Sequence, residues 1–219
     1  MKLTLFIAII IFLRYLVPRL VDFGAPEKSR RKTEWEYRVS FAKLNQELYE
    51  NADRQKKEEL IYYYTHKIRQ TDHYGTSSFA HMPKPLQVAY LINELVMEVN
   101  NGGYLQFFTN STGRYTEETL EALRAIGATY NHELLLKAVQ LLRKHGETHE
   151  NLNERINSEE LHKIMMTSDF YANEELMKEM YELDKKFYAY KEDISTLKMD
   201  YIEKHKNSLW KELEEKYSS

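Results

Sequence analysis

The sequence predicts an all-α protein, a single multi-helix domain preceded by an N-terminal hydrophobic helix. Only 7 glycines and 4 prolines occur among 219 residues, so turn formers are scarce. Apolar residues recur every three or four positions in most segments, and no segment shows sustained period-two alternation or a hairpin signal. Cysteine is absent, which excludes disulfides and thiolate metal sites.

Charge is distributed unevenly along the chain, although the net charge is only -3. Lys and Arg outnumber Asp and Glu by 14 to 9 in residues 1–70. In residues 147–219 the balance reverses, with 18 acidic residues against 11 basic ones. The acidic C-terminal third is either the solvated surface of ordinary helices or a surface that meets a basic partner.

An apolar segment opens the chain at residues 3–21. Nineteen helical residues at about 1.5 Å each just span a hydrocarbon core, so we expect residues 1–21 to be a membrane anchor. A cleaved signal peptide and a helix packed on the domain or a partner are the alternatives. Residues 22–33 form a basic linker, and the positive-inside rule places the domain, residues 34–215, in the cytoplasm. If the segment is a packed helix, the protein is expected to be soluble and cytoplasmic. If it is a signal peptide, the protein is expected to be exported.

The first part of the domain is expected to contain two amphipathic helices, a long loop and a central helix. One helix starts at Trp35, and its apolar stripe comprises Tyr37, Phe41, Leu44 and Leu48. A second helix covers residues 55–70, with Leu60, Ile61, Tyr64 and Ile68 inward. Residues 71–85 form the loop. The helix over residues 86–99 is apolar on most sides, so it should be the buried centre of the domain.

The second part of the domain is expected to contain five helices. Thr116 and Asn131 are predicted N-caps, and Gly127 and Gly146 end the helices that follow these caps. Residues 147–157 are polar and predicted to be a loop. A short helix starts at Ser158, a longer one at the N-cap Asn173, and the last contains the apolar residues Ile194, Leu197, Tyr201, Ile202, Leu209, Trp210 and Leu213.

The most distinctive stretch connects the central helix to the next one. It contains Glu94, Glu98, Asn100, Asn101, Gly102, Gly103, Tyr104, Gln106, Phe107, Phe108, Asn110, Ser111 and Gly113. Both adjacent glycines can take positive φ, so we expect the helix to end there and the aromatic residues to fold back on it. The polar side chains Asn101, Gln106, Asn110 and Ser111 are expected to bond the backbone of this corner.

Glu94 and Glu98 lie four residues apart on the central helix, beside this corner. Burial would raise the pKa of at least one carboxyl group, which would suit acid–base chemistry. The alternative is structural: a carboxylate at the end of a buried helix accepts backbone N–H bonds from the turn that follows. We favour the structural role.

The order Glu-x-x-x-Glu-Val-Asn-Asn-Gly-Gly-aromatic-x-Gln-Phe-Phe-x-Asn-Ser-x-Gly resembles the bacterial DNA-mimic protein family. The resemblance continues through Ala122 to Ala128 and through Leu183 to Tyr188, and covers roughly residues 40–210. It implies an acidic surface that imitates DNA phosphates and occupies the DNA-binding face of a transcription factor. Carried over, the tentative partner-binding residues are Glu174, Glu175, Glu179, Glu182, Glu192 and Asp193.

Enzyme signatures are absent from the sequence. His145 and His149 have metal-ligand spacing beside Glu147 and Glu150, but Gly146 should end their helix and no third ligand is evident. His66, His73 and His81 are spaced irregularly, as surface histidines are. No Ser/His/Asp order, phosphate loop or dinucleotide fingerprint occurs. We therefore expect no catalytic residue, metal or cofactor.

The expected function is that of a non-enzymatic domain that binds another protein through an acidic helical surface. One alternative is a DNA-mimic inhibitor of a DNA-binding protein or of a nuclease toxin. A different class is a helical metal-dependent hydrolase that uses Glu94, Glu98 and nearby histidines. Seventeen tyrosines suggest base stacking, but stacking platforms lie in basic grooves, so direct nucleic-acid binding is disfavoured.

Overall fold

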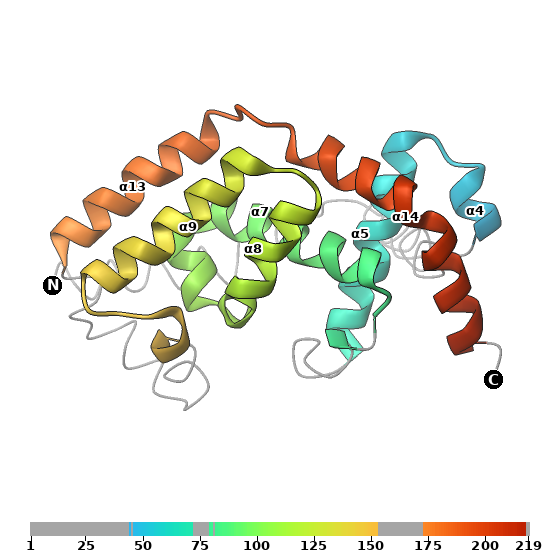
Figure 1. Ribbon diagram of the computed structural model, residues 1–219, viewed down its shortest axis with the longest axis horizontal. Helices are drawn as coiled ribbons and strands as arrows, with labels where there is room; N and C mark the ends of the chain where they lie inside the picture. Colours follow the sequence, from blue (N-terminus) through green and yellow to red (C-terminus); the bar gives the residue numbers. More distant parts are fainter. Residues whose placement is uncertain (1–43, 45, 72–78, 81, 153–172, 218–219) are drawn as a thin grey trace, which may run out of the picture. The chain divides into compact units, whose positions relative to one another are not determined.

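A computed structural model describes residues 44, 46–71, 79–80, 82–152 and 173–217, all within the compact unit Leu44–Ser219. This described part of the chain is helical and contains no strand, which confirms the predicted all-α class. Figure 1 shows its elements: α4 (Gln46–Glu50), α5 (Arg54–Thr71), α7 (Lys84–Thr109), the 3-10 helix η2 (Ser111–Tyr115), α8 (Thr116–Ala125), α9 (Thr129–Lys144), α13 (Glu174–Tyr188) and α14 (Ile194–Tyr217).

Helix α7 is the centre of this unit, as its apolar pattern predicts. It contacts α5, α8, α13, α14 and η2. Residues on several sides of it are almost fully buried, among them Leu86, Ala89, Ile92, Leu95 and Val99. A helix that is apolar nearly all round is stable only when other helices cover it, and five elements do so here.

The glycine pair interrupts the helix as predicted, because both glycines have non-helical backbone angles, and a second helical segment of α7 follows the kink directly. Gly103 has φ +76°, whereas Gly102, at φ −163°, is extended and not left-handed. Helical structure resumes at Tyr104 and continues to Thr109. Tyr104, Phe107 and Phe108 are at most 1% exposed within this second segment, so they bury their rings as part of a helix.

Several predictions for the N-terminal part fall outside the described residues. These are the apolar segment 1–21, the linker 22–33, the helix start at Trp35, and residues 72–78 and 81 of the predicted loop. Among the described helices, none is long and apolar enough to cross a membrane. Leu48, predicted to point inward, is 37% exposed, and its neighbour Tyr49 is the buried residue of α4.

Two predicted helix caps are wrong, whereas the predicted glycine stops are right. Thr116 is already helical and buried, and its hydroxyl donates to Gly113 O at 2.6 Å. Asn131 lies inside α9, which begins two residues earlier at Thr129. Gly127 and Gly146 have φ of +78° and +79° directly after α8 and α9, as left-handed C-terminal glycines do.

Helices α13 and α14 agree with the sequence pattern. The Asn173 side chain accepts the Leu176 N–H at 3.0 Å, so it caps α13 as predicted. The buried residues of α13 are Leu176, Met180, Leu183 and Phe187. Residues 149–152, predicted as loop, are helical, and the helix predicted from Ser158 lies outside the described part.

Candidate functional site

Glu98 is the acceptor that holds the end of α7 in place. Glu98 is only 7% exposed. Its carboxylate accepts hydrogen bonds from Gln106 Nε2 at 2.8 Å and from Asn110 Nδ2 at 2.5 Å. The expectation that Gln106 and Asn110 bond the backbone is therefore wrong, because their amide groups bond a carboxylate across the kink. The predicted bond from Glu98 to turn N–H groups is replaced by these two side-chain bonds.

Asp184 on α13 supplies the backbone acceptor that the sequence assigned to a glutamate. Its Oδ1 accepts the Tyr104 N–H at 2.9 Å, at the start of the second helical segment of α7. Burial raises the pKa of Asp184, while the Tyr104 N–H acts to lower it. A Cβ atom at Gly103 would lie closer to this carboxylate than real Cβ contacts allow. Gly103 is therefore required by its positive φ and by the approach of Asp184.

Other residues of this motif also contact neighbouring parts of the fold. A Cβ at Gly113 would collide with the Phe108 carbonyl at 2.5 Å. Asn100 Oδ1 accepts the Tyr190 hydroxyl at 3.1 Å, and the Ser111 carbonyl accepts Arg114 Nε at 2.6 Å. Asn101 is exposed. Glu94 is 3% exposed. The corner thus fixes the direction of α7 and joins it to α13.

Glu192 caps α9 from the turn between α13 and α14. Its carboxylate accepts the N–H groups of Tyr130 and Asn131 at 3.1 and 3.0 Å, and Asn131 Nδ2 at 2.7 Å. These are N–H groups of the first helical turn, which have no acceptor within the helix. Glu192 therefore performs the capping role predicted for Asn131.

The other acidic residues of the predicted partner-binding set differ in whether their carboxylates form hydrogen bonds or ion pairs. Asp193 accepts the Thr196 N–H at 2.9 Å and its hydroxyl at 2.7 Å, so it caps α14; these bonds lower the pKa of Asp193. Glu182 pairs with Lys185 at 2.6 Å on the helix surface. Glu174 is exposed. The six acidic residues predicted as one binding surface are therefore not equivalent.

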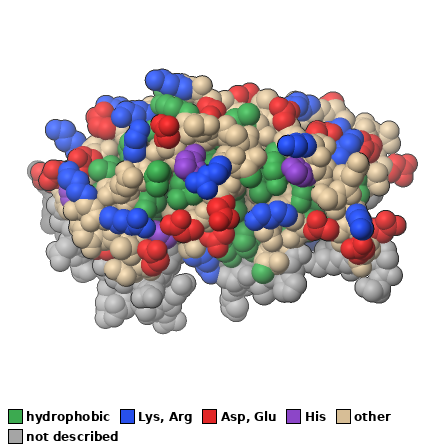
Figure 2. Space-filling model, viewed as in Figure 1, with side chains coloured by type: hydrophobic (Ala, Val, Ile, Leu, Met, Phe, Trp, Pro, Cys, Tyr) green, Lys and Arg blue, Asp and Glu red, His purple; other side chains and the backbone are tan. Residues whose placement is uncertain are grey.

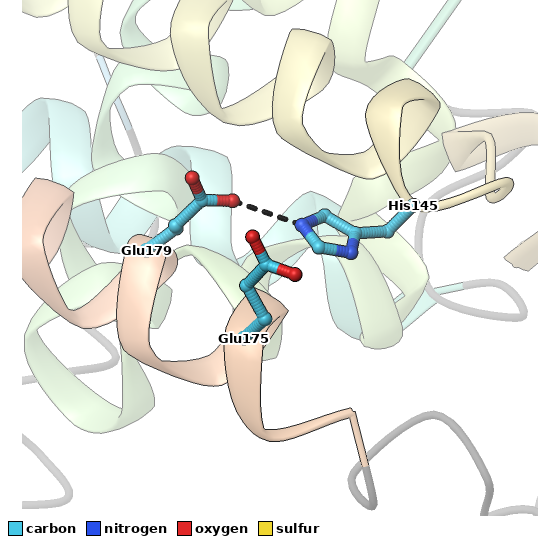
Figure 3. Close-up of side chains that lie close together, drawn as sticks. All are labelled: His145, Glu175 and Glu179. Atoms are coloured by element: carbon cyan, nitrogen blue, oxygen red, sulfur yellow. Dashed lines mark hydrogen bonds and ion pairs between the residues drawn. The ribbon is translucent and has the colours of Figure 1, made fainter.

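Glu175 and Glu179 meet the C-terminal end of α9 (Figure 3). Glu179 Oε2 lies 2.9 Å from His145 Nε2, and Glu179 Oε1 lies 2.8 Å from Lys144 Nζ. Lys144 Nζ is also 3.4 Å from Glu175 Oε1. Bonds from His145 and Lys144 lower the pKa of Glu179. This cluster joins α9 to α13 and was missed because its members lie about 30 residues apart in the sequence.

His145, Glu175 and Glu179 could in principle bind a metal, since their ligand atoms lie within 4.8 Å of one another. Two observations argue against it. Lys144 Nζ already contacts both carboxylates, at 2.8 Å from Glu179 and 3.4 Å from Glu175. In addition, Asn173 Oδ1 is used in the cap, so its Nδ2 faces His145 Nδ1 at 3.2 Å and donates to it. Nε2 of His145 then carries the ring proton. A metal ion at Nε2 would instead need the lone pair of this nitrogen, with the proton on Nδ1.

His149 lies in a different environment from His145, so the two histidines do not form one site. Its Nε2 is 3.2 Å from Glu150 Oε1 and 3.9 Å from Glu117 Oε1 on α8. His145 is directed at α13 instead. The spacing considered in the sequence therefore does not correspond to a shared metal site.

Helix α8 carries three carboxylates that the sequence did not single out as a binding surface. Glu117, Glu118 and Glu121 are exposed and share one side of the helix, opposite Thr119, Leu120 and Leu123. Among the described residues, no Lys or Arg forms an ion pair with any of the three. We call Glu117, Glu118 and Glu121 the α8 carboxylate face. Their i, i+1, i+4 spacing was the available signal.

This geometry defines an all-helical domain with exposed carboxylates. The chain belongs to the DMP19-like protein family, whose model matches residues 80–205. The match begins before α7 and ends within α14, and it agrees with the resemblance to DNA-mimic proteins seen in the sequence. No curated protein and no solved structure matches the chain.

Proposed function

We propose that this chain is a non-enzymatic protein-interaction domain of the DNA-mimic type, which binds a basic surface on a DNA-binding protein or nuclease. Family membership supports the mode of binding. The observation that carries the proposal is the α8 carboxylate face. Its three exposed carboxylates have no Lys or Arg partner among the described residues. Such carboxylates attract the Lys and Arg side chains that otherwise bind phosphates.

The partner-binding set inferred from the resemblance needs revision under this proposal. Glu179, Glu192 and Asp193 stabilise helix ends and contacts within the unit, so their charges are partly neutralised. Glu174, Glu175 and Glu182 remain more exposed on α13. Figure 1 shows α9 between α13 and α8. Figure 2, in the same view, shows acidic and basic side chains interspersed on the side of the molecule that faces the viewer. We therefore assign the main contact to α8 and a secondary one to α13.

Affinity capture with the full-length chain tests this proposal. We expect basic DNA-binding proteins or nucleases to be captured at low salt and to be released by duplex DNA, because mimic and DNA compete for one surface. The triple variant Glu117→Gln, Glu118→Gln, Glu121→Gln should lose the capture. The matched variant Glu174→Gln, Glu175→Gln, Glu182→Gln should reduce it less. Capture that duplex DNA does not displace would refute mimicry.

The non-enzymatic part of the proposal has its own test. The hydrolase alternative requires a bound metal, and the His145 cluster is the candidate group among the described residues. We expect the purified chain to contain no stoichiometric zinc, manganese or iron. Stoichiometric metal that is lost in a His145→Ala variant would favour the hydrolase.

The proposed location is the cytoplasmic side of a membrane, with residues 3–21 as the anchor. The support is the apolar segment and the basic residues that follow it in the sequence. Full-length protein should sediment with membranes and require detergent for release. Recovery in the soluble fraction after high-speed centrifugation would exclude an anchor.

A further inference from the structure

Asn101 is followed by Gly102, and this is the only Asn-Gly pair in the sequence. Both residues are exposed. The side chain of an asparagine carries an amide carbon, Cγ, which the main-chain nitrogen of the next residue can attack to close a succinimide ring. A glycine in the next position favours this reaction, because it has no Cβ to obstruct the approach of its nitrogen. Residue type and exposure are therefore both suited to a spontaneous reaction at this pair.

The kink of α7 removes the main obstacle that a helix presents to this reaction. Ring closure requires rotation about the Cα–C bond of Asn101, and inside a regular helix that rotation would break the hydrogen bonds of the next turn. Helical backbone angles end at Asn101 and resume at Tyr104, because Gly102 has φ −163° and ψ 26° and Gly103 has φ +76° and ψ −176°. The two successive glycines can absorb the rotation, since neither carries a Cβ.

The side-chain amide of Asn101 is also free to turn towards the main chain. Among the described residues it forms no hydrogen bond. Its neighbour Asn100 differs, because Asn100 Oδ1 accepts the Tyr190 hydroxyl at 3.1 Å. Asn110, from the same motif, differs too, because its Nδ2 donates to the Glu98 carboxylate at 2.5 Å. Of these three asparagines, only Asn101 combines a free amide with a glycine in the next position.

We propose that Asn101 is a deamidation site, at which the chain modifies itself without an enzyme. The main-chain nitrogen of Gly102 forms a bond to Asn101 Cγ, the bond from Cγ to Nδ2 breaks, and Nδ2 leaves as ammonia together with the former Gly102 N–H proton. Water then opens the succinimide at either carbonyl. One product is aspartate. The other is isoaspartate, in which the main chain runs through the side-chain carbon. Each product carries a new negative charge.

The two products affect the kink of α7 differently. Aspartate at position 101 keeps the length of the main chain and projects from an exposed position. Isoaspartate adds one methylene group to the main chain immediately before the glycine pair. The kink has little room for that change, because Asp184 approaches Gly103 closely and its Oδ1 accepts the Tyr104 N–H at 2.9 Å. The isoaspartate form should therefore unfold at a lower urea concentration, whereas an Asn101→Asp variant should unfold as the natural chain does.

This site is independent of the proposed function. Deamidation needs neither a partner nor the α8 carboxylate face, and it is measured on the purified chain alone. The α8 triple variant should deamidate at the natural rate, so the failure of either proposal can be recognised while the other holds.

The test compares, for each asparagine, the rate of deamidation in the folded chain with the rate in the unfolded chain. Full-length protein is incubated in mildly alkaline buffer with and without guanidinium chloride, and peptides from a protease digest are measured by mass spectrometry. Folding should slow the reaction of Asn101 less than about threefold, because local opening at the kink costs little. It should slow Asn110 and Asn207 more than about tenfold, since Asn110 is hydrogen-bonded and Asn207 lies inside α14. Methylation by an isoaspartyl methyltransferase identifies the isoaspartate product.

Asn101→Gln is the matched variant, because glutamine closes the corresponding ring much more slowly and position 101 is exposed. It should lose the isoaspartate from the peptide that contains residue 101, whereas Asn207→Gln should keep it. Folding that slows Asn101 as much as Asn207 would overturn the proposal. Isoaspartate that persists in this peptide of the Asn101→Gln variant would overturn it too, since the reaction would then belong to another asparagine. Circular dichroism of both variants confirms that the helices are intact.

Discussion

Helices α13 and α8 both carry two consecutive glutamates in their first turn, yet their carboxylates serve different purposes. In α13 and the turn after it, Glu179 contacts α9, Asp184 bonds the kink of α7, and Glu192 caps α9. On α8, Glu117, Glu118 and Glu121 project from the unit, and none pairs with a described Lys or Arg. Acidic composition therefore does not define an acidic surface. The position of each carboxylate relative to unsatisfied N–H groups decides how much charge remains available.

The contact between Asp184 and Gly103 should give the largest effect on stability. Gly103→Ala should destabilise the fold by about 3 kcal/mol, because φ +76° with ψ −176° is a conformation essentially restricted to glycine and because the added Cβ would displace the Asp184 carboxylate that accepts the Tyr104 N–H. Gly127→Ala is the matched control, since its φ is +78° but nothing lies within 4 Å of the added Cβ. We expect a cost of about 1 kcal/mol there. Equal costs in urea unfolding would show that Asp184 does not hold the kink.

The cap from Glu192 should give the next largest effect. Glu192→Ala removes the acceptor for two backbone N–H groups and one side-chain amide of α9, at a cost of about 2 kcal/mol. The control Glu182→Ala removes a surface carboxylate that pairs only within its own helix, and should cost less than about 0.5 kcal/mol. If urea unfolding gives similar midpoints for both variants, the proposed division among these carboxylates is wrong.

Acidification should affect Asp184 and Glu179 in opposite directions. The pKa of Asp184 is raised above 3.8, so its ionised form costs stability, and this cost disappears as the pH falls through the raised pKa towards 3.8. The pKa of Glu179 is lowered below 4.5, so its contribution is present above 4.5 and is lost as the pH falls through the lowered pKa.

Urea unfolding at several pH values between about 7 and 3 measures this difference. Asp184→Asn should lose more stability on acidification than the natural chain, because it lacks the compensating protonation. Glu179→Gln should lose less. Parallel pH profiles for all three proteins would contradict the assignment of these two groups.

The α8 carboxylate face should contribute least to stability. Substituting Glu117, Glu118 and Glu121 by Gln removes a favourable interaction with the start of the helix and the 3.9 Å contact between Glu117 and His149, together worth about 1 kcal/mol or less. Thermal unfolding should therefore change little, while partner capture is lost. A large fall in the melting temperature would mean that these carboxylates are structural, like those of α13.

The sequence predicted those features that depend on residues close together in the chain. Asn173 caps α13 through a bond to Leu176, three positions away, and Gly127 and Gly146 follow the helices that they end. The stripe Leu176, Met180, Leu183 and Phe187 follows directly from the helical period. Residue type alone predicted Thr116 and Asn131 as caps, and both predictions were wrong. A 3-10 helix leads directly into Thr116, and at the start of α9 the acceptor is the Glu192 carboxylate.

The features that only the tertiary structure decided join distant residues. Tyr104 and Asp184 are 80 positions apart, and Asn131 and Glu192 are 61 positions apart. The sequence by itself determined an all-helical domain, its central helix, its glycine corner and its family resemblance. It could not determine which carboxylates face solvent, because an N–H group at a helix end donates to any carboxylate that the packing brings near it. Packing places Asp184 and Glu192 at such groups and leaves the carboxylates of α8 exposed.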